Sequence, residues 1–179
     1  MSIAAIDHEP PPVQPFAALL YREEAPLATA LEALEELWSP LALRGAAHPF
    51  DRTDYYAPEM GEGLQRLLVA FSVLVPPTWL VPAKHEAARL EDILRTDGKR
   101  RVNIDVGYLD LYKVVLASWK HRGHKLYLDQ GVWGDLTLTF AKGAYRPLEW
   151  TFPDFRTGLY DTELHAMREA YKAQLREEE

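Results

Sequence analysis

The sequence predicts one α+β domain built on a largely antiparallel sheet. Apolar stretches of strand length alternate with two amphipathic helical stretches in the order β-α-β-β-α-β, which is the order of the ferredoxin-like split motif. Further strand-like stretches follow, joined by short turns that contain glycine, and they predict antiparallel hairpins that extend the sheet. A last amphipathic stretch predicts a final helix, and no linker-like segment divides residues 16–179.

The elements follow from local pattern. Residues 1–15 contain the stretch HEPPPVQP and predict a disordered lead, and FAALLY (16–21) predicts the first strand. Two glutamates before Pro26 favour a helix start, and Pro40 ends that helix. In chain order, the remaining predictions are strands over 41–47 and 64–75, a helix with its apolar stripe over 83–94, strands over 102–108, 112–118, 125–129, 135–140 and 145–150, and a final helix whose stripe covers 164–175.

The stretch GDLTLTF alternates apolar and polar residues, as a strand with one buried face does. It predicts that Leu136, Leu138 and Phe140 face the core and that Asp135, Thr137 and Thr139 face outward.

Composition excludes several classes of protein. The chain has no cysteine, which excludes disulfides and thiolate metal sites and fits a cytoplasmic location. The most apolar stretch, 67–83, is interrupted by three prolines, so it does not predict a membrane span. The net charge of −7 argues against general nucleic-acid binding. However, residues 99–125 contain seven Lys or Arg and two Asp, which suits one anionic small molecule.

The predicted strand that begins at Arg101 carries a polar row on one face. Period-two alternation directs its three apolar residues to one side and Arg101, Asn103, Asp105 and Gly107 to the other. Arginine binds anions with two donors, asparagine donates and accepts, and aspartate accepts from a hydroxyl. The row therefore predicts a ligand surface. A solvated sheet face with an internal Arg–Asp pair is the alternative.

Other candidate ligand residues surround this row. Lys99 is expected to hold an anion together with Arg101, and Tyr55 or Tyr56 to close over it. His124 stands between basic residues and is a further candidate for the anion site. Arg156 lies in the aromatic stretch WTFPDFRT, where an ion pair with Asp154 inside a packed segment is the alternative.

The loop FDRTDYYAPEMG supplies the candidate metal ligands. Asp51, Asp54 and Glu59 fall within nine residues, and carboxylates are ligands that Mg²⁺ accepts beside a phosphate. Residues of this kind also form turns and helix caps, and the loop has no calcium-binding pattern. The chain also has no P-loop, dinucleotide-binding, hydrolase or zinc-protease motif.

Four segments together resemble a bacterial and archaeal family, the domain of unknown function 4416 family. They are FDRTDYYAPEMG, GKRRVNIDVGYLDLYKVVLAS, HKLYLDQGVWGDLTL and WTFPDFRT, and the resemblance runs from about Phe16 to the last helix. The chain has Val106 where the family pattern has Pro, and Lys125-Leu126-Tyr127-Leu128 where it has Arg-Ile-Tyr-Leu. Some relatives carry an automatic GTP-binding label, so the resemblance implies a phosphate ligand, although this sequence has no guanine-binding N-K-x-D motif.

These observations predict a protein that binds a phosphate-bearing small molecule, nucleotides included, on the polar strand face. Two alternatives stay open. One is a Mg²⁺-dependent enzyme acting on such a ligand, and the other is a non-catalytic module whose basic strip binds an acidic partner protein. The sequence leaves open whether the protein is an enzyme.

Overall fold

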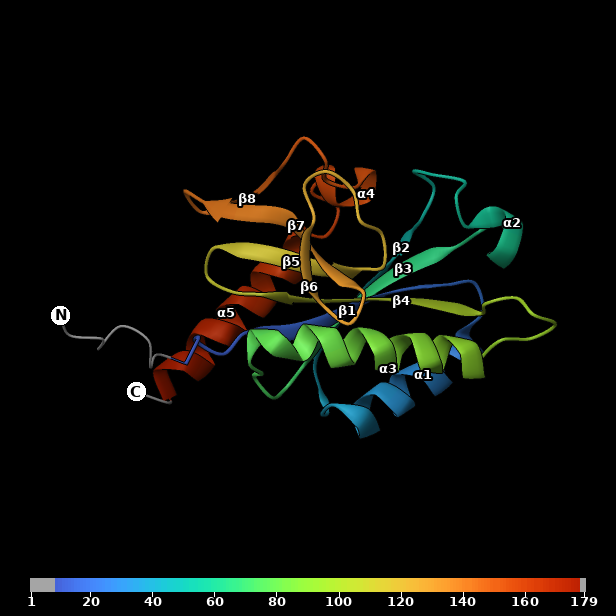
Figure 1. Ribbon diagram of the computed structural model, residues 1–179, viewed down its shortest axis with the longest axis horizontal. Coiled ribbons are helices and arrows are strands. Elements are labelled where there is room, and N and C mark those ends of the chain that lie inside the picture. Colours follow the sequence, from blue (N-terminus) through green and yellow to red (C-terminus); the bar gives the residue numbers. More distant parts are fainter. Residues whose placement is uncertain (1–8, 178–179) are drawn as a thin grey trace.

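The computed structural model describes residues 9–177 and shows, within them, an eight-stranded antiparallel sheet with five α-helices (Figure 1). The strands are β1 (Gln14–Tyr21), β2 (Leu41–Pro49), β3 (Gln65–Phe71), β4 (Val102–Leu109), β5 (Lys113–Ser118), β6 (Leu126–Asp129), β7 (Val132–Ala141) and β8 (Ala144–Pro147). The α-helices are α1 (Glu24–Leu37), α2 (Ala57–Met60), α3 (Leu80–Ile93), α4 (Pro153–Arg156) and α5 (Asp161–Glu177), and a 3-10 helix, η1 (Pro77–Trp79), precedes α3. The predicted mixed α and β composition is confirmed.

The lead predicted to be disordered, residues 1–15, is only partly covered by the described residues. Residues 1–8 lie outside the described residues. Of the rest, Val13 forms an antiparallel bridge with Val75, and Gln14 is already the buried first residue of β1.

The strands are arranged in the order β2-β3-β1-β4-β5-β7-β6, with β8 also paired to β7, and every neighbouring pair is antiparallel. Eight strands are predicted and eight are present among the described residues, but their order in the sheet is more complex than a four-stranded motif with hairpins added in sequence. The first part of the chain forms strands β1 to β4 together with α1 and α3. Strands β5 to β8 come later in the sequence and extend the sheet beyond β4.

Helices cover both faces of the sheet. Alternate residues of β1, such as Ala17 and Leu19, face α1 and α3, which lie together below the sheet in Figure 1. The residues between them, such as Phe16 and Ala18, face α5 on the opposite side. Because both faces are buried, β1 is an apolar run without polar alternation.

Strand β4 is paired along its whole length on one edge only. All eight residues pair with β1, but only Gly107, Tyr108 and Leu109 pair with β5. A Cβ atom at Gly107 would lie 2.7 Å from the carbonyl oxygen of Val115, so the paired part is tight enough to need glycine. Among the described residues, the stretch 102–106 has no strand on its β5 side, and the seam between β4 and β5 is open there.

One prediction about β7 is wrong. Asp135 and Thr137, expected to face solvent, are only 4% and 1% exposed. The pairing of β5 with β7 shifts register between Val114 and Val115, and Leu136 and Leu138 consequently pack on opposite faces of the sheet. A local pattern cannot reveal such a bulge, because it depends on the partner strand.

The helices were also compared with the length and apolar character of a membrane-spanning helix. Within residues 9–177, no helix combines the length and the apolar character needed to cross a bilayer.

Candidate functional site

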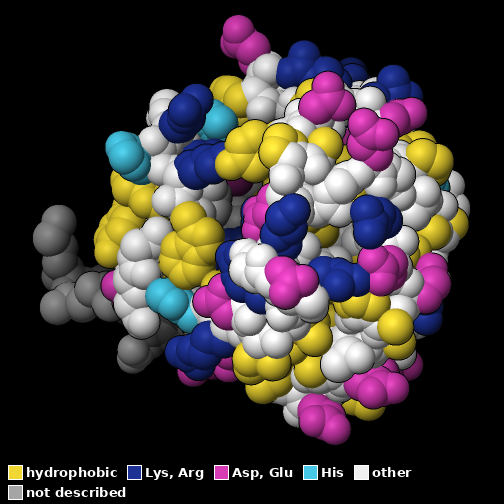
Figure 2. Space-filling view, turned by 90° about the vertical axis from the view of Figure 1, so that its right-hand side faces the viewer, with side chains coloured by type: hydrophobic (Ala, Val, Ile, Leu, Met, Phe, Trp, Pro, Cys, Tyr) yellow, Lys and Arg dark blue, Asp and Glu magenta, His cyan; other side chains and the backbone are white. Residues whose placement is uncertain are grey.

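A cavity of 530 Å³ lies at the open seam between β4 and β5. Strand β4 contributes Asn103 and Asp105, and helix α3 contributes Lys84 and Glu91. The residues that line it are Phe50, Arg52, Thr53, Tyr55, Tyr56, Arg66, Lys84, Glu91, Arg100, Asn103, Asp105, Leu116, Ala117, Ser118, Trp119, Lys120, Lys125, Asp135, Phe152, Pro153, Asp154 and Phe155. Figure 2 shows basic side chains (dark blue) and acidic ones (magenta) along a recess on this side of the molecule.

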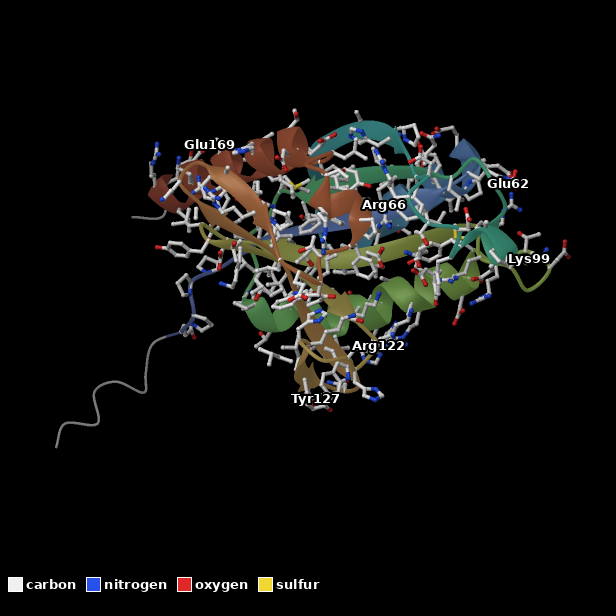
Figure 3. The ribbon with its side chains drawn as sticks, turned by 90° about the horizontal axis from the view of Figure 1, so that it is seen from above. Glu62, Arg66, Lys99, Arg122, Tyr127 and Glu169 are labelled. Carbon is white, nitrogen blue, oxygen red and sulfur yellow. The ribbon has the colours of Figure 1, made fainter. Side chains whose placement is uncertain are left out.

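A buried ion cluster holds one wall of the cavity. Arg66 comes from the middle of the molecule (Figure 3), and its side chain is 5% exposed. Its Nη1 donates to Asp105 Oδ2 at 2.8 Å, and its Nε lies 3.8 Å from Asp154 Oδ2. Burial alone would raise the pKa of Asp105, but the charges of Arg66 and Lys84 outweigh it, so the pKa lies below its usual value. Asp105 is therefore a carboxylate at neutral pH.

Asn103 and Arg100 form the next part of the wall. Arg100 Nη1 donates to Asn103 Oδ1 at 2.7 Å, and the same guanidinium binds both carboxylate oxygens of Glu59. The amide nitrogen of Asn103 is buried and makes no hydrogen bond of normal geometry within the described residues, and the same is true of Arg66 Nε. Each donor has a carboxylate beside it, Asp105 for Asn103 and Asp154 for Arg66 Nε, but neither donor makes a well-aligned hydrogen bond. A ligand oxygen placed at either atom would supply a better acceptor.

Glu91 reaches the cavity from α3. Its Oε1 accepts a hydrogen bond of 2.5 Å from the backbone N–H of Ile104, a donor on the open side of β4. Burial raises the pKa of Glu91 to about 7, although the Ile104 N–H and the charge of Lys84 act in the opposite direction. Perturbed carboxyl groups of this kind gather in functional sites, and Glu91 can exchange a proton near neutral pH.

A second charged group closes the side formed by β7. Lys125 Nζ lies 3.2 Å from one oxygen of Asp135, and His124 Nε2 lies 3.1 Å from the other. The imidazole of His124 stacks on Trp150 at a centroid distance of 4.6 Å. Each carboxylate oxygen of Asp135 thus has one partner, and these contacts fix the positions of the Lys125 ammonium group and the His124 ring.

Aromatic rings alternate with basic groups around the cavity. The pairs are Phe50 with Arg66, Tyr56 with Arg100, Tyr55 with Lys120, Trp119 with Lys84 and Phe152 with Lys125, with cation-to-centroid distances from 4.4 to 6.0 Å. Tyr55, Trp119 and Phe152 are between 43% and 62% exposed, so rings stand open to solvent at the mouth. Lys120 Nζ also donates to Tyr55 Oη at 3.1 Å. That hydrogen bond and the lysine charge lower the pKa of Tyr55.

The structure brings together part of the predicted ligand set. Asn103, Asp105, Tyr55 and Tyr56 all line the cavity. His124 is next to it, through Asp135.

The other predicted ligand residues lie elsewhere. Arg101 Nη2 donates to Glu23 Oε2 at 2.5 Å beside the start of α1. Lys99 is exposed at the end of the molecule (Figure 3), and Arg156 is bonded to the backbone carbonyls of Leu148 and Glu149. None of these three basic residues is among those that line the cavity.

The predicted metal ligands are not gathered. Asp51 and Asp54 are exposed, and Asp51 lies 3.5 Å from Arg52. Glu59 is bound to Arg100 and also to Arg95. Within residues 9–177, no three or more acidic or histidine side chains are placed to hold a metal ion.

Several lining residues were missed at the sequence level. The sequence does mark Arg66 as unusual, because it is a lone arginine inside the apolar run LQRLLVAFSVLV, where a buried charge needs a partner. Nothing in the sequence marks Lys84 or Glu91, because lysine and glutamate are ordinary on a helix surface.

The sequence from residue 11 to residue 171 matches the model of a family described as a domain of unknown function, DUF4416. The chain belongs to this family. The resemblance carried by the four segments is thus confirmed, and the DUF4416 range includes every residue that lines the cavity. Its two ends also meet, since Tyr171 Oη donates to the carbonyl of Pro12 at 2.7 Å. Neither the curated proteins nor the solved structures contain a match to the chain.

Proposed function

We propose that the protein binds a phosphate-bearing small molecule in the cavity between β4 and β5. The observation that carries the proposal is the charge of the lining. Six basic and four acidic side chains line the cavity, whereas the whole chain has a net charge of −7. A basic recess in an acidic protein attracts and holds an anion.

The cavity supports an assignment of roles. Lys120 Nζ has the Tyr55 hydroxyl, and not a carboxylate, as its hydrogen-bond partner, so its charge is available to a phosphate at the mouth. Deeper inside, the buried donors Asn103 Nδ2 and Arg66 Nε make no well-aligned hydrogen bond, although carboxylates lie beside them, so both suit further ligand oxygens. Asp105 is placed to accept from a ligand hydroxyl. The proposed ligand of the anion is therefore Lys120, whereas the sequence predicted Arg101.

The size of the cavity supports a compact ligand. A volume of 530 Å³ is within the range of small-molecule sites, about 300–1,000 Å³. The exposed rings of Tyr55, Trp119 and Phe152 suit a ligand with a planar or apolar part, so nucleotides stay within the proposed class together with sugar phosphates.

Calorimetry with a panel of nucleotides and sugar phosphates tests the proposal. We expect at least one compound to bind, and we expect Lys120→Ala to weaken its affinity by about tenfold to a hundredfold. The matched control is Lys172→Ala, which removes one positive charge from α5, where Lys172 binds Glu169. Absence of binding across the panel, or equal losses in the two variants, would contradict this site.

The two alternative functions stay predictions. A Mg²⁺-dependent enzyme would need the carboxylates of Asp51, Asp54 or Glu59 to gather around an ion. Stabilisation by Mg²⁺ that disappears in Asp51→Asn would support it. A protein-interaction module predicts salt-sensitive association with an acidic partner and no small-molecule effect.

We also infer that the first part of the fold is a ferredoxin-like unit. Its support is the order β2-β3-β1-β4 with antiparallel neighbours and with α1 and α3 on one face. The cytoplasmic location predicted from the sequence belongs to the same set of proposals.

A further inference from the structure

Lys84 is a buried lysine without a close carboxylate. It is 7% exposed and lines the cavity. Within the described residues its ammonium group has no hydrogen bond and no ion pair within 4.0 Å, and its contact is the ring of Trp119, whose centroid is 5.9 Å away. The Lys84 side chain as a whole is covered, but its Nζ is not among the buried atoms that lack a hydrogen bond, so this nitrogen reaches the accessible space of the cavity. The amine of Lys84 is therefore available to a ligand.

Four carboxyl groups line the cavity together with this amine, and two of them, those of Glu91 and Asp105, are affected by its charge. Glu91 lies about two turns further along α3, on the same side of the helix as Lys84, and Asp105 faces them from β4. The charge of Lys84 acts on both carboxyl groups. One oxygen of Glu91 is fixed by the Ile104 N–H, and the other lies 3.9 Å from Arg100 Nη1. Among the described residues that second oxygen accepts no hydrogen bond, so it can gain and lose a proton beside Arg100.

We propose that Lys84 forms an imine with a phosphorylated aldehyde or ketone bound in the cavity, and that Glu91 carries the protons of this reaction. The proposal rests on the proposed function, because the phosphate holds the carbonyl carbon near Lys84. A lysine amine inside a binding cavity is a recurring nucleophile toward carbonyl substrates.

The step is balanced without a co-reactant. Glu91 takes a proton from the Lys84 ammonium, and the neutral amine forms a C–N bond to the carbonyl carbon. A proton moves from nitrogen to the carbonyl oxygen, which gives a carbinolamine. Glu91 then returns its proton to the hydroxyl group, the C–O bond breaks, and water leaves. One ammonium and one carbonyl compound give one iminium ion and one water.

The surroundings of Glu91 fit this exchange. Its pKa of about 7 lets it hold and release a proton at neutral pH. Asp105, in contrast, is held as a carboxylate beside Arg66, so it is the weaker candidate for carrying protons.

Reductive trapping tests the proposal. The full chain is incubated with dihydroxyacetone phosphate and sodium cyanoborohydride, which converts an imine into a stable secondary amine, and labelled peptides are identified by mass spectrometry. We expect Lys84 to be labelled faster than Lys172, which serves as an internal control on the same molecule. Lys84→Arg keeps the positive charge and removes the nucleophile, so this variant is expected to lose the fast label while keeping its melting temperature.

A second variant separates the role of Glu91. Glu91→Gln keeps an acceptor for the Ile104 N–H but has no proton to carry. We expect it to slow labelling of Lys84 by about 100-fold and to flatten the pH dependence of the rate around neutral pH. An unchanged rate and pH profile would overturn the role of Glu91.

The outcomes distinguish this inference from the proposed function. If phosphate compounds bind in calorimetry but Lys84 is labelled no faster than Lys172, the imine proposal is wrong and the binding proposal stands. If dihydroxyacetone without phosphate labels Lys84 as fast as the phosphate ester does, Lys84 is a nucleophile, but the phosphate site and the preference for a phosphorylated substrate are wrong.

Discussion

Two hollows of similar volume lie along helix α3, and they differ in chemistry. The cavity of 530 Å³ is lined by ten charged side chains. A groove of 510 Å³ near the start of α3 is lined mainly by apolar groups such as Val81 and Leu128, and among the described residues that line it Asp129 alone is charged. Volume therefore does not distinguish the two.

The difference follows from the pairing of β4 with β5. The groove lies over the closed part of the seam, where Tyr108 pairs with Val115, and both residues line it. The cavity lies at the open part, where the side chains of Asn103 and Asp105 face the space that a paired strand would limit. Where the two strands pair, their backbone N–H and C=O groups bind each other, and apolar side chains can line the surface. Where the strands diverge, polar side chains must bind these backbone groups, as Glu91 binds the N–H of Ile104.

The largest effect is expected at Arg66. Arg66→Met would leave the buried Asp154 and the partly exposed Asp105 without their shared cation, and we expect the free energy of unfolding to fall by about 3–5 kcal/mol. The comparison in the groove is Tyr127→Ala, an exposed residue for which we expect a change within about 0.5 kcal/mol. Urea denaturation measures both. A similar small change in the two variants would mean that the ion cluster does not stabilise the fold.

The next effect concerns pH. Glu91 binds its proton more tightly when folded, because its pKa is raised from 4.5 to about 7. The raised pKa of Glu91 contributes up to about 3 kcal/mol to the free energy of unfolding. This contribution is fully present below about pH 4.5 and is lost as the pH rises to about 7. Glu91→Gln should remove this part of the pH dependence, which denaturation at a series of pH values measures. An identical slope in both proteins would contradict the raised pKa.

A smaller effect is expected at the seam itself. In Gly107→Ala the new methyl group would meet the Val115 carbonyl at 2.7 Å, so the paired part of β4 and β5 must open further, at about 1–3 kcal/mol. The control is Gly134→Ala on β7, where the nearest atom is a Leu128 side-chain carbon at 3.4 Å. Thermal unfolding compares the two, and equal melting temperatures would show that the seam tolerates the methyl group.

The smallest effect is expected at Arg101. Its ion pair with Glu23 is partly exposed, so Arg101→Ala should change stability by less than about 1 kcal/mol. It should also weaken ligand binding less than Lys120→Ala does. Calorimetry on both variants decides between the strand-end site predicted from the sequence and the cavity.

Much of the fold was predictable, because periodicity reports which face of an element is buried. The alternation of Val102, Ile104 and Val106 with Asn103 and Asp105 is present as predicted, since the three apolar residues are buried in the core that faces α1 and α3. The short helix α4 was missed, because four residues beginning at Pro153 are too few to show a helical period.

The candidate site was predictable only in part. Asn103 and Asp105 were found because they are unusual in a strand. Arg101 was assigned to the same row, but it precedes β4 and turns toward Glu23. The cavity depends on which strands diverge, and this is a property of pairing between distant segments. No local pattern around Lys84 or Glu91 contains that information.

The last helix has a consequence for the order in which the protein is made. Leu164, Met167 and Tyr171 of α5 cover the face of β1 that contains Phe16 and Ala18. This face stays uncovered on the nascent chain until α5 has left the ribosome, long after β1, β3 and β4 have been synthesised. Aggregation of incomplete chains is therefore a hazard until α5 has been synthesised, and folding of the whole sheet waits for α5.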